Sequence, residues 1–235
     1  MELEVLDRLQ DRGRIEAIWG TINGLSTTSF FLSWGWIENC LGSLPESIPV
    51  RMALISGDSK PVVAFFFGEK ESRRKGIFKS RGFFLNSTGS SLCDSLCIEY
   101  NSMPQLGNRI PSFKEVLDLL PEWWNEFFLP GLDPSCFPGN CLSEIPVPYK
   151  VLIESEVSSP YVDLERVRNE GDYLTLVSSN TRSQLRKAYR MLSGPNGLSL
   201  QAAADLGECM EIFGEPVELH QNTWVARGVW VRVFL

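Results

Sequence analysis

The sequence has a single histidine, a negative net charge and no long apolar run. Only one histidine, His220, occurs in 235 residues, so any histidine-based nucleophile triad depends on it. A formal net charge of −7 argues against nucleic acid as a main partner, because phosphate binding relies on clustered lysine and arginine. No apolar run has the length of a membrane span. The sequence also lacks a G-x-S-x-G elbow and a Walker loop.

The start of the chain, Met1-Glu2-Leu3-Glu4, is acidic and lacks the basic and apolar regions of a signal peptide. We therefore expect a cytoplasmic protein whose six cysteines are reduced thiols. The pairs Cys93/Cys97 and Cys136/Cys141 raise the alternative of a zinc module. Cys93 and Cys97 fall in a predicted strand, where four residues span too far for close chelation. We expect no metal.

The length allows one large domain or two small ones, and the composition is that of a folded protein. The chain is 43% apolar and 22% charged, which is ordinary for a globular domain. Residues 129–148 contain five prolines and resemble a connection between halves. We place the boundary near residue 155, which gives domains 1–155 and 156–235.

Residue patterns predict helices and an antiparallel meander in the first part. Apolar spacing indicates one or two short helices within 3–22 and a second helix capped by Thr27 or Thr28. Helical spacing over 113–128 is interrupted by Pro121, where we expect a kink or a break. The expected strands are 50–56, 62–67, 76–85, 92–100 and 150–155, with a charged turn at 69–75.

A basic helix is predicted after the cap signal Ser178-Ser179-Asn180-Thr181. Arg182, Arg186 and Arg190 recur every four residues and share one face, beside an apolar stripe of Leu185, Tyr189 and Leu192. Guanidinium groups on one face can bind an anionic substrate or phosphates. The alternative is a solvated helix face with Glu165 and Glu170 as ion-pair partners.

Several segments together carry a family resemblance. The chain resembles the acetyltransferases associated with cellulose and exopolysaccharide synthesis, the CelD/BcsL family of the GNAT superfamily. The segments are Phe31 to Ile37 (FLSWGWI), Asp94 to Asn101 (DSLCIEYN), Pro160 to Leu164 (PYVDL), the helix of Arg182 to Arg190, Leu219 to Trp224 (LHQNTW) and Arg227-Gly228.

The resemblance implies an α/β (α+β) fold with a GNAT-like, mixed, largely antiparallel sheet and flanking helices. It further implies a FemABX-like double-GNAT arrangement whose second half is incomplete here. The implied activity moves an acyl group from acetyl-CoA, or another acyl-CoA, to an amine or sugar hydroxyl of a small-molecule or saccharide acceptor. In such enzymes a base deprotonates the acceptor, which attacks the thioester directly.

The resemblance also implies candidate catalytic and binding residues. His220 and Asp94 are weak candidates for the base, and the alternative for His220 is a hydrogen-bonded structural residue. The arginines of the basic helix, Arg182, Arg186 and Arg190, together with Trp224, are candidates for binding substrate or cofactor.

A site for the CoA pyrophosphate is not evident in the sequence. The nearest match to the superfamily's R/Q-x-x-G-x-G/A turn is 73–78, which we interpret as a hairpin turn. We expect the chain to stop before the region that would hold acetyl-CoA. The alternative function is therefore a non-catalytic, truncated remnant or an interaction module without a CoA site, which self-associates through exposed apolar surface.

Overall fold

The computed structural model describes residues 1–23, 29–94, 98–106, 111–132, 148–158, 160–194 and 197–227. The chain divides into two compact units, unit 1 (Met1–Glu156) and unit 2 (Val157–Leu235). Within the described ranges, no helix combines the length and the apolar character needed to cross a bilayer. Unit 1 is a mixed α/β structure and unit 2 is helical.

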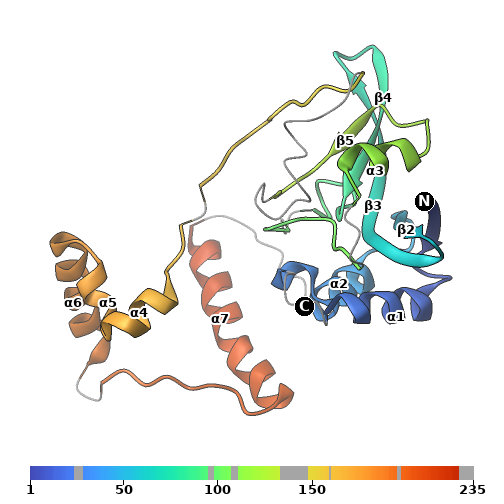
Figure 1. The fold of residues 1–235 in the computed structure, drawn as a ribbon. Helices are drawn as coiled ribbons and strands as arrows, with labels where there is room; N and C mark the ends of the chain where they lie inside the picture. Colours follow the sequence, from blue (N-terminus) through green and yellow to red (C-terminus); the bar gives the residue numbers. More distant parts are fainter. Residues whose placement is uncertain are drawn as a thin grey trace. The chain divides into compact units, whose positions relative to one another are not determined.

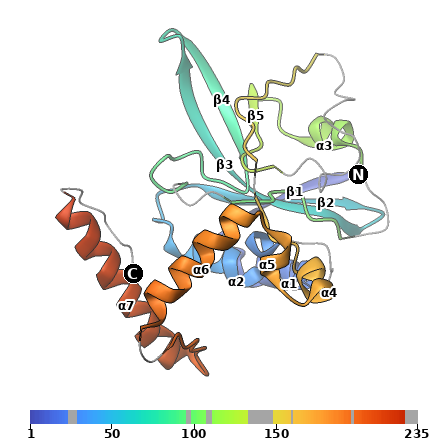
Figure 2. The same ribbon diagram turned by 90° about the vertical axis from the view of Figure 1, so that its left-hand side faces the viewer.

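Unit 1 is built on an open sheet of five strands in sequential order (Figures 1 and 2). Four strands pair antiparallel, whereas the fifth lies parallel to its neighbour β4. The expected mixed, largely antiparallel sheet with flanking helices is thus confirmed. The strands are β1 (Glu2–Asp7), β2 (Val50–Gly57), β3 (Lys60–Arg74), β4 (Phe78–Leu85) and β5 (Glu126–Phe128).

Tight turns set the register of the two hairpins. Asp58 and Ser59 both have positive φ, 51° and 60°, which gives the turn between β2 and β3 the twist of its strands. Lys75 and Gly76, with φ of 50° and 74°, connect β3 to β4. Residues 73–78 therefore form the hairpin turn that the sequence predicts. The charged stretch 69–75 was expected to be the turn, but β3 continues to Arg74.

Neighbouring residues of β2 and of the first half of β3 point to opposite sides, and a hydrophobic core covers each side. On one face α1 (Arg12–Asn23), the 3-10 turn η1 (Phe30–Leu32) and α2 (Trp34–Ser43) pack on Met52, Leu54 and Phe66. The indole of Trp19 donates a hydrogen bond to the Leu32 carbonyl over 2.8 Å. On the other face α3 (Phe113–Leu119) packs on a second core around Phe65, Phe67 and Phe83.

Two expected helices differ from the structure at their ends. Residues 2–7 form edge strand β1 rather than helix, because Leu6 is buried against the sheet while β1 pairs with β2. Ser33, whose side chain accepts a hydrogen bond from Trp36 N–H, caps α2. The expected caps Thr27 and Thr28 lie outside the described residues.

The helix predicted over 113–128 ends at Leu119, immediately before Leu120 and Pro121. The expected break at the proline is confirmed. The continuation beyond it is wrong, since residues 126–128 form β5.

Two expected strands are wrong where the structure describes them. Residues 91–94 form a turn and 98–100 contain bends, so no strand follows β4 there. Residues 150–155 have no sheet partner and are exposed. The place beside β4 is taken by β5, whose pairing depends on the chain returning from α3.

Two buried asparagines tie the loops of unit 1 to the sheet. Asn86 accepts from Phe66 N–H over 2.8 Å, and its amide donates to Asn101 Oδ1 over 2.7 Å. Asn101 is fully buried, and its own amide donates to the carbonyls of Leu85 and Pro130 over 3.1 and 2.8 Å. Each polar group of the pair thus has a partner, which offsets the cost of removing it from water.

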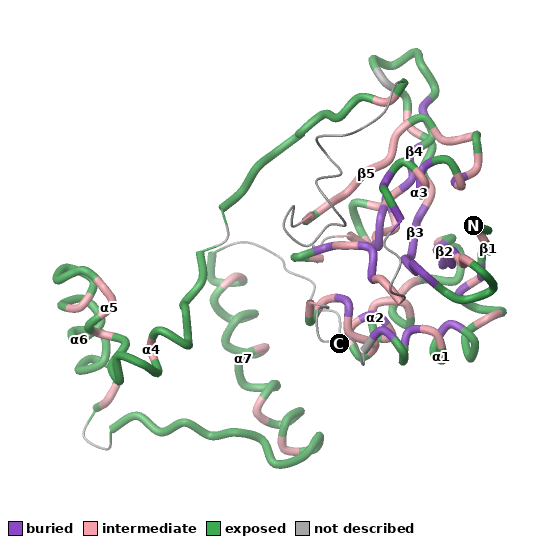
Figure 3. Tube along the Cα trace, viewed as in Figure 1, coloured by how far each residue is buried: buried purple, intermediate pink, exposed green. Residues whose placement is uncertain are grey.

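Unit 2 contains four described helices without a buried residue (Figure 3). Each begins at a side-chain cap, as expected for exposed helices that depend on local hydrogen bonds. The caps are Asp163, Asp172, Ser178 and Asp205. The helices are α4 (Leu164–Glu170), α5 (Tyr173–Leu176), α6 (Ser179–Ser193) and α7 (Leu206–Ala226). The predicted basic helix is confirmed as α6.

We predict that Asn101→Ala lowers the free energy of unfolding by about 3 kcal/mol, because the carbonyls of Leu85 and Pro130 and the Asn86 amide lose their partner. Urea unfolding of the whole chain, followed by tryptophan fluorescence, measures this change. The matched control is Asn39→Ala on the exposed surface of α2, which should shift stability by less than about 0.5 kcal/mol. Equal effects of the two substitutions would contradict a structural role for the buried pair.

Candidate functional site

The three predicted arginines lie on α6, and their hydrogen bonds are local. Arg182 donates from Nη2 to the carbonyl of Val177 over 3.2 Å, and its Nε has no hydrogen-bond partner among the described residues. Arg190 Nε donates to the Arg186 carbonyl over 3.3 Å. Within the described residues, no ion pair joins these arginines to an acidic side chain. None of the described residues therefore neutralises these cations, and they can meet an external anion.

His220 and Trp224 meet on α7, one turn apart. The Trp224 indole N–H donates to His220 Nε2 over 2.7 Å. This bond makes Nε2 the acceptor, so the ring proton of the neutral histidine is assigned to Nδ1. The lone pair that a general base would use is thus occupied by the indole. His220 can act as a base only if this hydrogen bond breaks.

Asp94 organises a loop of unit 1. One carboxylate oxygen, Oδ1, accepts hydrogen bonds from both the backbone N–H and the hydroxyl of Thr88, each over 2.8 Å. The Thr88 hydroxyl in turn accepts from Ser90 N–H over 2.9 Å. Through these contacts Asp94 holds the loop at Thr88 in place. Among the described residues, no donor forms a hydrogen bond to the second carboxylate oxygen.

The predicted site residues are divided between the two units. Asp94 belongs to unit 1, whereas the other candidates lie on α6 and α7 of unit 2. Among the described residues, no hydrogen bond or ion pair joins α6 to His220 or Trp224. The catalytic and binding roles of these residues stay predictions.

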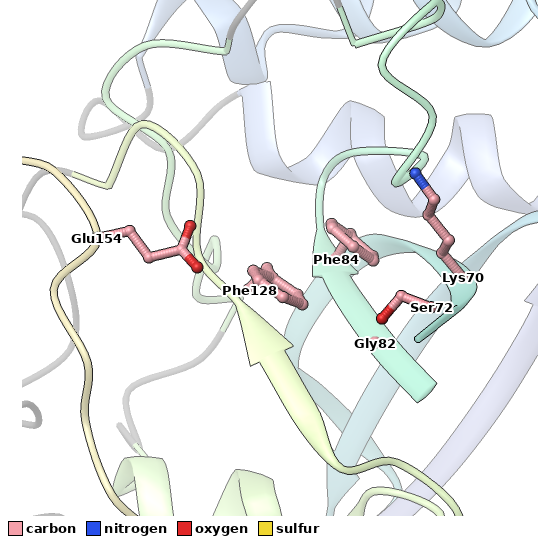
Figure 4. A pocket seen from close by; sticks show the side chains of 6 residues that line it. All are labelled: Lys70, Ser72, Gly82, Phe84, Phe128 and Glu154. Carbon is pink, nitrogen blue, oxygen red and sulfur yellow. The ribbon is translucent and has the colours of Figure 1, made fainter. Parts of the chain in front are cut away.

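Sequence reasoning missed a hollow on the β3–β4–β5 part of the sheet (Figure 4). Its volume is about 230 Å³. The rings of Phe84 and Phe128 are stacked with centroids 4.5 Å apart and planes 9° apart, which forms an apolar wall. The lining residues are Lys70, Ser72, Gly82, Phe84, Phe128 and Glu154.

Two glycines make room for the Phe84 ring. A Cβ at Gly82 would lie 2.8 Å from the Phe84 ring and 3.0 Å from that of Phe128. Gly89 has φ +75°, and a Cβ there would also approach Phe84 to 2.8 Å. Glycine at these positions therefore lets the stacked pair lie against the strands.

The hollow combines an apolar wall with one cation and one carboxylate. Lys70 supplies an ammonium, Ser72 a hydroxyl and Glu154 a carboxylate that points toward the Phe128 side (Figure 4). Polar groups beside an apolar surface are typical of small-molecule sites. No local pattern indicates it, because the residues come from three strands and a distant segment that only the fold brings together.

The described residues contain no group of three or more His, Cys, Asp or Glu side chains that could hold a metal ion. Cys93 is a free thiol. The other cysteines of the two pairs considered for zinc, Cys97, Cys136 and Cys141, lie outside the described residues.

Comparison of the chain with protein-family models, with curated proteins and with solved structures finds no match. The geometry of the site is therefore the basis for proposing a function.

We predict that Trp224→Phe keeps α7 helical and releases His220 Nε2, because phenylalanine keeps an aromatic ring but lacks the indole donor. The imidazole ¹⁵N chemical shifts of His220 should then show mixed tautomers instead of one. Circular dichroism checks that helicity changes little, since one i,i+4 pair contributes only about 0.2–0.5 kcal/mol. The control Trp36→Phe, in unit 1, should leave the His220 signals unchanged. Unaltered tautomers in Trp224→Phe would contradict the hydrogen bond.

Proposed function

We propose that the protein is an acyltransferase that moves an acyl group from acyl-CoA to an amine or sugar hydroxyl, in polysaccharide synthesis. The observation that carries the proposal is the hollow beside the parallel pair β4–β5, with its aromatic wall and two opposite charges. The mixed, largely antiparallel sheet agrees with the fold that the family resemblance implies.

The residues of the hollow fit the apolar acyl end of acyl-CoA better than its pyrophosphate. The stacked Phe84 and Phe128 rings suit the apolar arm and acyl group. The pyrophosphate requires cations or a row of backbone N–H groups at a helix N-terminus. The turn at Lys75-Gly76 leads into β4 rather than a helix, so it does not provide such a row. Lys70 is the cation that the hollow offers to phosphate.

The proposed reaction needs a base for the acceptor. Glu154 supplies the carboxylate of the hollow, and it accepts the proton as the acceptor N or O bonds to the acyl carbon. The C–S bond breaks, and the departing CoA thiolate takes up the proton. Glu154 thereby joins His220 and Asp94 as a candidate base, and it is the one that lines the hollow.

Acetyl-CoA binding to the whole chain, measured by calorimetry, tests the proposal. We expect saturable micromolar binding, weakened about tenfold by Lys70→Gln, because a charge-assisted hydrogen bond to the ligand contributes roughly 1.5–3 kcal/mol. Lys79→Gln is the matched control, since Lys79 is odd-numbered on β4 and lies on the face opposite Gly82 and Phe84.

Absence of binding to the native chain would contradict the acyl-CoA site. Binding that Lys70→Gln and Lys79→Gln weaken equally would place the ligand away from the hollow.

The exposed helices of unit 2 favour a second candidate, an interaction module. Leu200 and Leu206 are 99% and 76% exposed, and apolar side chains on α6 and α7 are also uncovered. Exposed apolar surface of this kind is typical of binding faces.

For this second candidate we predict concentration-dependent self-association of the native chain, measured by sedimentation velocity. The change Leu206→Ser/Leu219→Ser should reduce it by removing two exposed leucines of α7. The control Thr223→Ser on the same helix should not. A strictly monomeric native chain over the whole concentration range would contradict self-association.

A further inference from the structure

Helix α6 separates its charged and apolar side chains around its axis. At about 100° per residue, Arg182, Arg186 and Arg190 fall within one arc of roughly 80°, and Lys187 lies beside it. A neighbouring arc of roughly 160° carries the apolar side chains of Leu185, Ala188, Tyr189, Met191 and Leu192. The separation is sharper than in α1, α2 or α7, the other described helices of ten or more residues.

Neither arc of α6 is covered. Tyr189, Met191 and Leu192 are 60%, 74% and 71% exposed, and no residue of α6 is buried. The helix is otherwise well formed, since Ser178 caps its first turn and accepts a hydrogen bond from Thr181 N–H over 3.2 Å. An exposed apolar stripe along an ordered helix is typical of an interaction surface.

The charge of α6 indicates what that occupant is. Its fifteen residues contain four cations and no acidic side chain, in a chain whose formal net charge is −7. Helix α7 of the same unit carries Glu208, Glu211, Glu215 and Glu218, and so lacks this character. The partner of α6 is therefore anionic on one side and apolar on the other.

We propose that α6 docks lengthwise on an anionic lipid surface. Its arginines pair with headgroup phosphates, while the Leu185–Tyr189–Leu192 stripe enters the boundary with the acyl chains. A sharply amphipathic helix with low mean hydropathy and a basic polar face is the type that lies in a membrane interface. A soluble phosphate would engage only the basic arc and leave the apolar arc in water. This proposal does not depend on the acyltransferase activity.

Co-sedimentation of the full chain with lipid vesicles tests the docking. One set of vesicles is phosphatidylcholine alone, and the other is an equimolar mixture of phosphatidylserine and phosphatidylcholine. We expect binding to the mixed vesicles that weakens as salt rises, because the attraction is screened. Binding to phosphatidylcholine alone should be far weaker.

Two variants separate the contributions of charge and apolar surface. Arg182→Gln/Arg186→Gln/Arg190→Gln should weaken binding on the order of 100-fold, since each charge near an anionic surface contributes roughly fivefold. Leu185→Ala/Leu192→Ala keeps helix propensity and should weaken it at least about tenfold. Both variants alter exposed or half-exposed side chains, and circular dichroism verifies that α6 persists.

The matched control removes three charges elsewhere, in Lys150→Gln/Arg166→Gln/Arg168→Gln. It should bind vesicles within about threefold of the native chain, because these three cations lie outside α6 and do not belong to its basic arc. Equal losses in this control and the α6 arginine variant would overturn the proposal. Unchanged vesicle binding by Leu185→Ala/Leu192→Ala would also overturn the proposal. The attraction would then be purely electrostatic, and any polyanion, including an acidic protein, could provide it. Absence of binding to the mixed vesicles would overturn it outright.

Discussion

The hydrogen bond between the Asn86 and Asn101 side chains is the constraint on which unit 1 depends. It lies in the interior, where an unpaired amide costs more than a paired one gains. The pair links three segments that are distant in sequence: β3 through Phe66, the end of β4 through Leu85, and the chain after β5 through Pro130. Hydrophobic burial is not directional, so these amides supply the specificity that the apolar core lacks.

The same contacts position the hollow. Asn101 N–H donates to the carbonyl of Gly131 over 2.9 Å, three residues after β5 ends. Gly131 has φ +60°, and a Cβ there would lie 1.9 Å from the Ile98 carbonyl oxygen, so only glycine permits this approach. By fixing the chain just beyond a three-residue strand, the network holds β5 beside β4. The stacking of Phe128 on Phe84 follows from that placement.

The parts of the structure that the sequence predicts are those with local causes. The β2–β3 hairpin, the β3–β4 turn and α6 arise from turn residues, alternation and capping within a few positions. Strands β1 and β5 could not be predicted in this way, because each is short and exists only through pairing with a distant partner. The hollow escapes prediction for the same reason, since Lys70, Gly82 and Phe128 become neighbours only when the sheet forms.

In unit 2, the hydrogen bonds among the described residues are local. Asp163, Ser178 and Asp205 cap their own helices, and the Trp224–His220 bond spans one turn of α7. Local bonds of this kind stabilise isolated helices only marginally, and helices in proteins depend mainly on packing of an apolar face. The described helices of unit 2 lack such packing, so their stability must increase when the apolar faces are covered. Binding of any surface that covers the apolar faces therefore stabilises these helices.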